Sequence, residues 1–125
     1  MSKAIWMVAT RCTDPAREEE FNRWYDEVHL PDILSVPHVV AARRYRLARD
    51  ASRSASPWAA EDGPRYLAVY ELDTDDPDAV LRAVGELRPR LVAEGRMIDV
   101  IEGSSSTFFT ALGARQEAAA AEVVG

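Results

Sequence analysis

The chain has 125 residues, 47 % of them hydrophobic and 29 % charged, which predicts one soluble globular domain. Its formal net charge of -6 repels nucleic acid and anionic lipid, so we expect neither as a partner. No stretch approaches the roughly 20 apolar residues of a membrane span, and a cytoplasmic location is the default expectation.

The first elements in chain order are a strand and a helix. Residues 3–10 are apolar on both faces and predict a buried strand. Thr13 or Asp14 is expected to cap the helix, Pro15 to open it and Pro31 to end it. Its apolar stripe recurs at i, i+3, i+4 and i+7 and comprises Phe21, Trp24, Tyr25 and Val28. The single cysteine, Cys12, excludes an internal disulfide and is predicted to be a small buried hydrophobe, a thiol nucleophile being the alternative.

Two period-two segments follow, and each predicts a strand. They cover residues 37–47 and 65–72. The stretch between them, residues 48–64, is rich in Ser, Ala, Gly and Pro and has no period. It predicts a loop longer than a hairpin needs, which suggests a lid or an oligomer contact.

A second helix is predicted from Asp75 or Asp76 as its cap to Gly95 at its end, with Pro77 in its first turn. Pro89 lies inside it and is expected to kink or split it. Residues 96–103 predict the last strand, with a continuation through residues 106–110. The alanine-rich tail is expected to be a short helix or disordered.

The order strand, helix, strand, strand, helix, strand predicts an α+β, ferredoxin-like βαββαβ fold with an antiparallel sheet. Both helices then cover one face, and the other face is too apolar to remain in water. A second copy of the chain is the simplest cover, so we expect a homodimer that forms a dimeric α+β barrel with a cavity inside. The barrel domain is assigned to residues 1–112 and the tail to residues 113–125.

One group of polar residues on the first helix has the chemistry of an acid–base site. Asn22, Asp26 and His29 are spaced i, i+4, i+7, so Asp26 is expected to lie beside His29. Histidine both accepts and gives protons near neutral pH, and a neighbouring carboxylate fixes its tautomer. The alternative is a histidine that merely favours the negative end of the helix dipole.

The stretch "NRWYDEVHLPDILSVPHVVAARRYRL", residues 22–47, resembles the signature of the EthD-like branch of the dimeric α+β barrel superfamily. The strand and helix order fits this resemblance over residues 3–109. One departure is His38, which stands where the family has glycine, so the turn is expected to differ. His38 is either a second imidazole near the cavity mouth or an exposed turn residue. The positions that match the signature are Trp24, Tyr25, His29, Pro31, Asp32, Pro37, Arg44 and Tyr45.

The resemblance implies a range of reactions, because the superfamily includes polyketide cyclases, muconolactone isomerases, cofactor-independent quinone-forming monooxygenases and haem enzymes. Haem is not expected, since both histidines lie in the first half of the chain. No ligand cluster has the spacing of a metal site, so we expect neither cofactor nor metal. By similarity, His29 is the general base or acid of the cavity.

The sequence therefore predicts a polyketide-type cyclase or isomerase of secondary metabolism, in which His29 removes a proton next to a carbonyl of a small hydrophobic or aromatic substrate. Asp32 either orients His29 or caps the following turn. The alternatives are a cofactor-independent monooxygenase and a non-catalytic protein that binds or helps assemble a hydrophobic metabolite. The candidates to stabilise the enolate are Tyr45, Tyr66, Tyr70, Asn22 and Arg44. The candidates to line the cavity are Trp6, Trp24, Tyr25, His38 and Phe109, of which Trp6 and Trp24, each taken alone, are better explained by core packing.

Overall fold

The computed structural model describes residues 3–53 and 65–119 of the chain. Its elements follow the predicted order. They are β1 (Ala4–Cys12), a short 3-10 turn (Pro15–Arg17), α1 (Glu18–Trp24), a π-helical turn (Tyr25–His29), α2 (Leu30–Leu34), β2 (Val39–Arg46), β3 (Tyr66–Leu72), α3 (Pro77–Ala93) and β4 (Ile101–Thr110).

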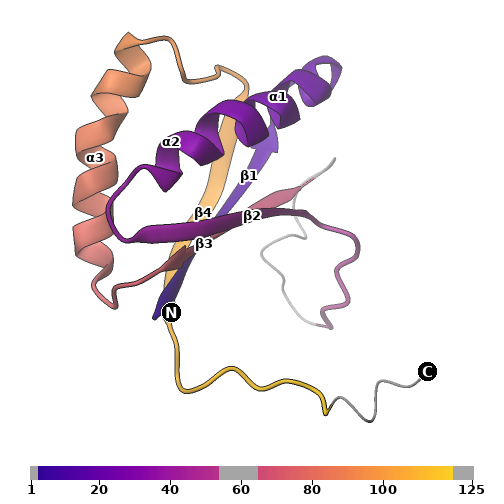
Figure 1. The fold of residues 1–125 in the computed structure, drawn as a ribbon. Coiled ribbons are helices and arrows are strands. Elements are labelled where there is room, and N and C mark those ends of the chain that lie inside the picture. Colours follow the sequence, from indigo (N-terminus) through magenta and orange to yellow (C-terminus); the bar gives the residue numbers. More distant parts are fainter. Residues whose placement is uncertain (1–2, 54–64, 120–125) are drawn as a thin grey trace.

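The four strands form one sheet in the order β2-β3-β1-β4, and every neighbouring pair is antiparallel. All three helices lie on one side of this sheet (Figure 1). This arrangement is the ferredoxin-like α+β fold, so the fold predicted from the sequence is confirmed.

The core lies between the helices and the sheet. Across the sheet, Trp6 of β1 pairs with Tyr70 of β3 and with Phe108 of β4. The ring of Trp6 stacks on Phe108 at 5.3 Å and lies 5.0 Å from Tyr70. From the helices, Phe21 and Tyr25 are fully buried in the same core, with Phe21 5.6 Å from the ring of Tyr66 in β3 and Tyr25 hydrogen-bonded to Tyr70, so this part of the predicted apolar stripe does face the sheet.

Both predicted caps are present, although the first begins the 3-10 turn over Pro15–Arg17 and α1 itself starts at Glu18. The side chain of Asp14 accepts a hydrogen bond from the Ala16 amide, and that of Asp76 accepts one from the Asp78 amide. Gly95 follows α3 at a φ of 69°, a left-handed conformation that glycine adopts without a steric cost. The predicted split at Pro89 is wrong, because α3 continues through it from Pro77 to Ala93.

The prediction that Pro31 ends the first helix is also wrong. α2 continues to Leu34, with the proline in its first turn. A proline inside a helix lacks an amide hydrogen and its ring clashes with the carbonyl four residues earlier. The π-helical turn immediately before Pro31 is wider than an α-turn and gives this ring room.

The last strand begins later than predicted. Residues 96–100 form no strand, whereas β4 includes the end of the predicted strand, residues 101–103, and the whole of the predicted continuation, residues 106–110. β4 is an edge strand that pairs only with β1, and most of its residues are exposed. Side chains on an exposed edge strand do not have to be apolar, so the serine-rich stretch has no alternation of hydrophobic residues that would predict a strand.

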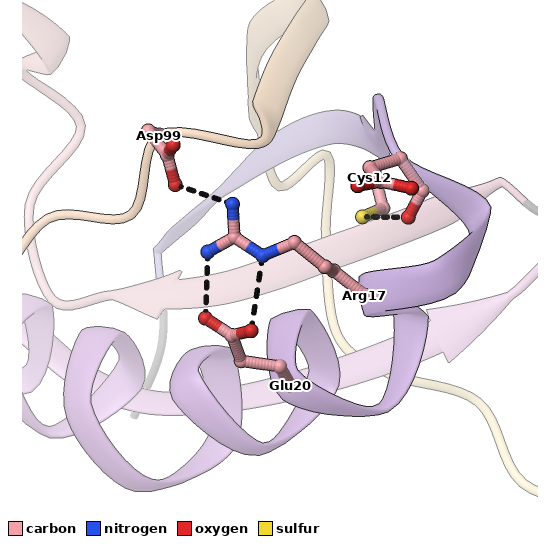
Figure 2. A network of polar contacts seen from close by, with 5 residues as sticks. Cys12, Arg17, Glu20 and Asp99 are labelled. Atoms are coloured by element: carbon pink, nitrogen blue, oxygen red, sulfur yellow. Dashed lines mark hydrogen bonds and ion pairs between the residues drawn. The ribbon is translucent and has the colours of Figure 1, made fainter.

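A polar network ties the start of α1 to the segment before β4 (Figure 2). Arg17 binds Glu20 through two nitrogens and contacts Asp99 at 2.9 Å. Beside it, the thiol of Cys12 is buried and donates to the Asp14 carbonyl at 3.2 Å. Cys12 therefore lies in the core, where it was predicted.

Residues on alternate positions of the strands point away from the helices. Ile5, Met7 and Val69 lie on this outer face, as does Phe109, which is 52 % exposed.

Residues 111–119 run away from the sheet and contain no helix (Figure 1). Most of the predicted loop, residues 54–64, and the end of the tail, residues 120–125, lie outside the described residues. Within the described part of the chain, no helix is long and apolar enough to span a membrane.

Candidate functional site

The π-helical turn decides where His29 lies. In a regular α-helix, residues five apart are about 140° apart around the axis. In a π-turn the hydrogen bond joins residues five apart, as the Leu30 amide does to the Tyr25 carbonyl, so residue i+5 lies above residue i. His29 accordingly stacks on Trp24 at 4.8 Å and 21°, and meets Tyr25 edge-on at 5.0 Å. The predicted contact with Asp26 is not formed.

The imidazole of His29 is held in an apolar environment. Its Nδ1 is buried and has no hydrogen-bond partner. Burial lowers the pKa of His29 to about 4, and the positive charges of Arg88 and Arg44 act in the same direction. The charge of Asp32 opposes this shift without overcoming it. The ring is therefore neutral near pH 7 and is able to accept a proton.

Asp32 does not hydrogen-bond to His29. Its Oδ2 accepts from Nε of Arg96 at 2.8 Å, and its side chain is only 16 % exposed. The carbonyl of Arg96 in turn accepts from Nε1 of Trp24 at 2.7 Å. The predicted orienting role of Asp32 is thus replaced in this structure by an ion pair with Arg96.

Arg44 of β2 is the centre of a second polar group. Its Nη1 donates to Asp26 at 3.0 Å and its Nη2 to Asn22 at 2.8 Å, and its side chain is 11 % exposed. Its guanidinium lies 4.3 Å from the ring centre of Tyr25 and 5.1 Å from that of Tyr66. These contacts hold the cation in place. Its Nε is buried without a hydrogen-bond partner, so this donor is unused.

The Arg44 group lines a pocket of about 390 Å³ between the first helix and the edge strand β2. The Nδ2 of Asn22 donates to the hydroxyl of Tyr66 at 3.1 Å, and that hydroxyl donates to Glu18. The pocket is lined by Asn22, Asp26, Arg44, Tyr45, Arg46 and Tyr66. His29 does not line it; the ring of Tyr25 lies between His29 and Arg44.

Two buried tyrosines, Tyr25 and Tyr70, lie next to the Arg44 group, and the guanidinium of Arg44 contacts the first of them. A side-chain hydrogen bond joins Tyr25 and Tyr70. Burial raises the pKa of both phenols, so both stay protonated throughout the neutral range. Thr10 lies close by with a buried hydroxyl that finds no partner of good geometry. The interior next to Arg44 therefore holds hydroxyl groups in a largely apolar setting.

The remaining predicted site residues lie elsewhere. Trp6 is buried in the core, and Phe109 is on the outer sheet face, so the two do not form one wall. Tyr45 is 47 % exposed and reaches the pocket only from the edge of β2. His38 binds Asp73 at 2.9 Å on the surface, and it has a φ of 76°, a left-handed conformation that glycine adopts more easily than histidine.

Sequence reasoning missed Glu18, Arg46 and Arg96. Arg96 is 64 residues from its partner Asp32, and nothing in the spacing of the sequence connects them. Across residues 3–53 and 65–119, no group of three or more His, Cys, Asp or Glu side chains is placed to hold a metal ion.

The fold is similar to that of solved proteins. HapK from Hahella chejuensis superposes with a TM-score of 0.60 at 18 % identity, over 93 % of this chain and 99 % of that chain. The monooxygenase from the gene ActVA-Orf6 of Streptomyces coelicolor, solved in complex with nanaomycin D, gives 0.50 at 16 % identity, over 94 % of both chains. No family model matches the chain and no curated protein matches its sequence. At such low identity, the likeness shows the ferredoxin-like fold.

Proposed function

We propose that the protein is a cofactor-independent enzyme that removes a proton from a flat phenolic substrate of the polyketide type, and that molecular oxygen then oxidises the resulting anion. The observation that carries this proposal is His29, a neutral imidazole in an aromatic setting, whose neighbour Tyr25 also contacts the fixed cation of Arg44. A pKa of about 4 makes the imidazole a weak base at pH 7, so transfer of the proton to it depends on Arg44 stabilising the anion that forms.

The reaction balances without a cofactor. In a hydroxylated anthrone, the CH₂ group loses two hydrogens and becomes a carbonyl with one atom of O₂. The other oxygen atom leaves as water with both hydrogens. The protein only has to accept and return protons: His29 is unprotonated near pH 7, and its low pKa means that it returns a proton readily. The similarity in fold to a monooxygenase that was solved with nanaomycin D supports this reading.

A cyclase or isomerase of the same substrate class is the second candidate. It is supported by the chain of hydrogen bonds from Asn22 through Tyr66 to Glu18, which provides a phenol to return a proton to a carbon or an oxygen. Such an enzyme converts the substrate without consuming oxygen. The two candidates therefore share their first step and differ in one measurable quantity.

The test follows a hydroxylated anthrone and a linear polyketide mimic by absorbance, with an oxygen electrode in parallel. His29→Phe keeps an aromatic ring in the stack and should abolish turnover. His38→Asn is the matched control, because it removes the chain's other imidazole at a position where asparagine tolerates positive φ. Turnover that survives His29→Phe refutes the role of His29, and turnover without oxygen uptake favours the cyclase or isomerase.

The enzyme is proposed to act as a homodimer. The outer sheet face presents Ile5, Met7, Val69 and Phe109 on the side away from the helices, and a second copy would remove these side chains from water. Sedimentation should give a dimer, and Val69→Glu should give a monomer. A monomeric native protein would contradict this proposal.

A further inference from the structure

We propose that Arg96 is a positioning residue of the His29 site, because it binds both the carboxylate whose charge acts on the imidazole and the indole on which the imidazole stacks. The inference rests on the proposed function, since positioning matters only if His29 takes part in a reaction. Arg96 is remote from His29 in sequence and does not line the 390 Å³ pocket.

The geometry gives Arg96 two partners that each act on His29. Its Nε binds Oδ2 of Asp32 at 2.8 Å, three residues after His29. Its carbonyl accepts from Nε1 of Trp24 at 2.7 Å, and Trp24 is the ring on which His29 stacks. The backbone of Arg96 is itself fixed, because its amide donates to the Leu91 carbonyl at 2.9 Å in the turn that ends α3.

The electrostatic consequence concerns the direction of the Asp32 carboxylate. The charged groups that act on His29 are Asp32 from α2, Arg44 from β2 and Arg88 from α3. Only Asp32 favours the protonated imidazole. While Arg96 binds it, Asp32 forms no hydrogen bond with the ring, and Nδ1 of His29 stays without a partner. Without Arg96, the carboxylate is released to hold the imidazole in its charged form.

A purely structural role would be to fasten the segment after α3 to the first helix. Arg17 has this role at the other end of the same segment, where it contacts Asp99 at 2.9 Å (Figure 2). Arg17 also binds Glu20 and makes no contact with Trp24 or Asp32. Arg17→Met is therefore a matched control that removes a comparable ion pair away from His29.

The experiment is an NMR titration of the two imidazoles in the full chain, with His38 as the internal reference. Arg96→Met should raise the pKa of His29 by about one unit, the size expected when a nearby carboxylate becomes free to pair with it. Arg96→Lys should restore most of the native value. Asp32→Asn should lower the pKa of His29, and Arg96→Met should then have no further effect.

The inference is overturned if Arg96→Met leaves the His29 titration unchanged, if its effect persists in the Asp32→Asn background, or if Arg17→Met shifts His29 equally. Arg96→Gln makes the same prediction should the methionine variant not fold. The titration needs no substrate, so it separates the two proposals. If the shift occurs while His29→Phe retains turnover, the proposed function fails and the coupling between Arg96 and His29 stands.

Discussion

Acidification offers a direct test of how His29 is held. The pKa of this imidazole falls from 6.5 to about 4 on folding. Between these values the unfolded chain binds more protons than the folded one, so stability falls as the pH falls. The loss begins near the unfolded pKa and is complete once the pH is below the folded one. Above about pH 7, His29 contributes no pH dependence.

The size of the effect follows from the two pKa values. Taking 6.5 and about 4, the free energy of unfolding should decrease by about 2.4 kcal/mol between about pH 7 and about pH 4.5 through this one group. Because typical domains are stable by only about 5–15 kcal/mol, this is a large share of the total. Other carboxylates also titrate in acid, so the effect has to be isolated by substitution.

The assay is urea unfolding at several pH values and one protein concentration, for the native chain and for His29→Phe. Phenylalanine keeps the stack on Trp24, and the buried Nδ1 that it removes has no partner to leave unsatisfied. The variant should be at least as stable as the native protein at neutral pH and should lose less stability in acid. Parallel pH curves for the two proteins would refute the buried, neutral imidazole.

Two further changes test other parts of the structure. His38→Val should destabilise the protein by about 1–2 kcal/mol relative to His38→Gly in urea unfolding, because a β-branched residue is poorly tolerated at a φ of 76°; equal stabilities would contradict this strain. Arg44→Met removes a cation that lowers the pKa of His29, so the imidazole should titrate at a higher pH by NMR, and an unchanged titration would show that Arg44 does not act on it.

Most of the fold was predictable because its signals are local. Pro15 and Pro77 follow aspartate caps, Gly95 ends α3, and period-two segments mark β2 and β3. β4 was misplaced because an exposed edge strand is held by backbone pairing to β1, which leaves its serines free of any hydrophobic pattern.

The sequence predicted several residues of the candidate site but not which of them contact each other. Asn22 and Asp26 do share a helix face, yet both bind Arg44 and neither contacts His29. The partner of Asp32 is Arg96, a contact set by how the turn after α3 packs against the first helix. Long-range ion pairs of this kind depend on tertiary placement, which single-sequence spacing does not encode.

The π-helical turn explains both the misassigned helix face and the helix that continues past Pro31, and it carries one more prediction. In an α-helix each residue adds about 100° of rotation, so a one-residue deletion normally turns every later side chain away from the core.

Glu27 is exposed and lies within the wide turn. Its deletion should convert that turn to α-helix and leave the imidazole four residues after Trp24, still on the same face. Arg23 is also exposed, but it lies in α1 before the wide turn. Its deletion should rotate either Trp24 and Tyr25 or the start of the helix out of register with the core, and should therefore destabilise the protein much more. The two variants are compared by thermal unfolding and by the NMR resonance of His29. If both deletions cost the same stability, the wide turn is not a one-residue insertion that can be removed without disturbing the rest of the helix.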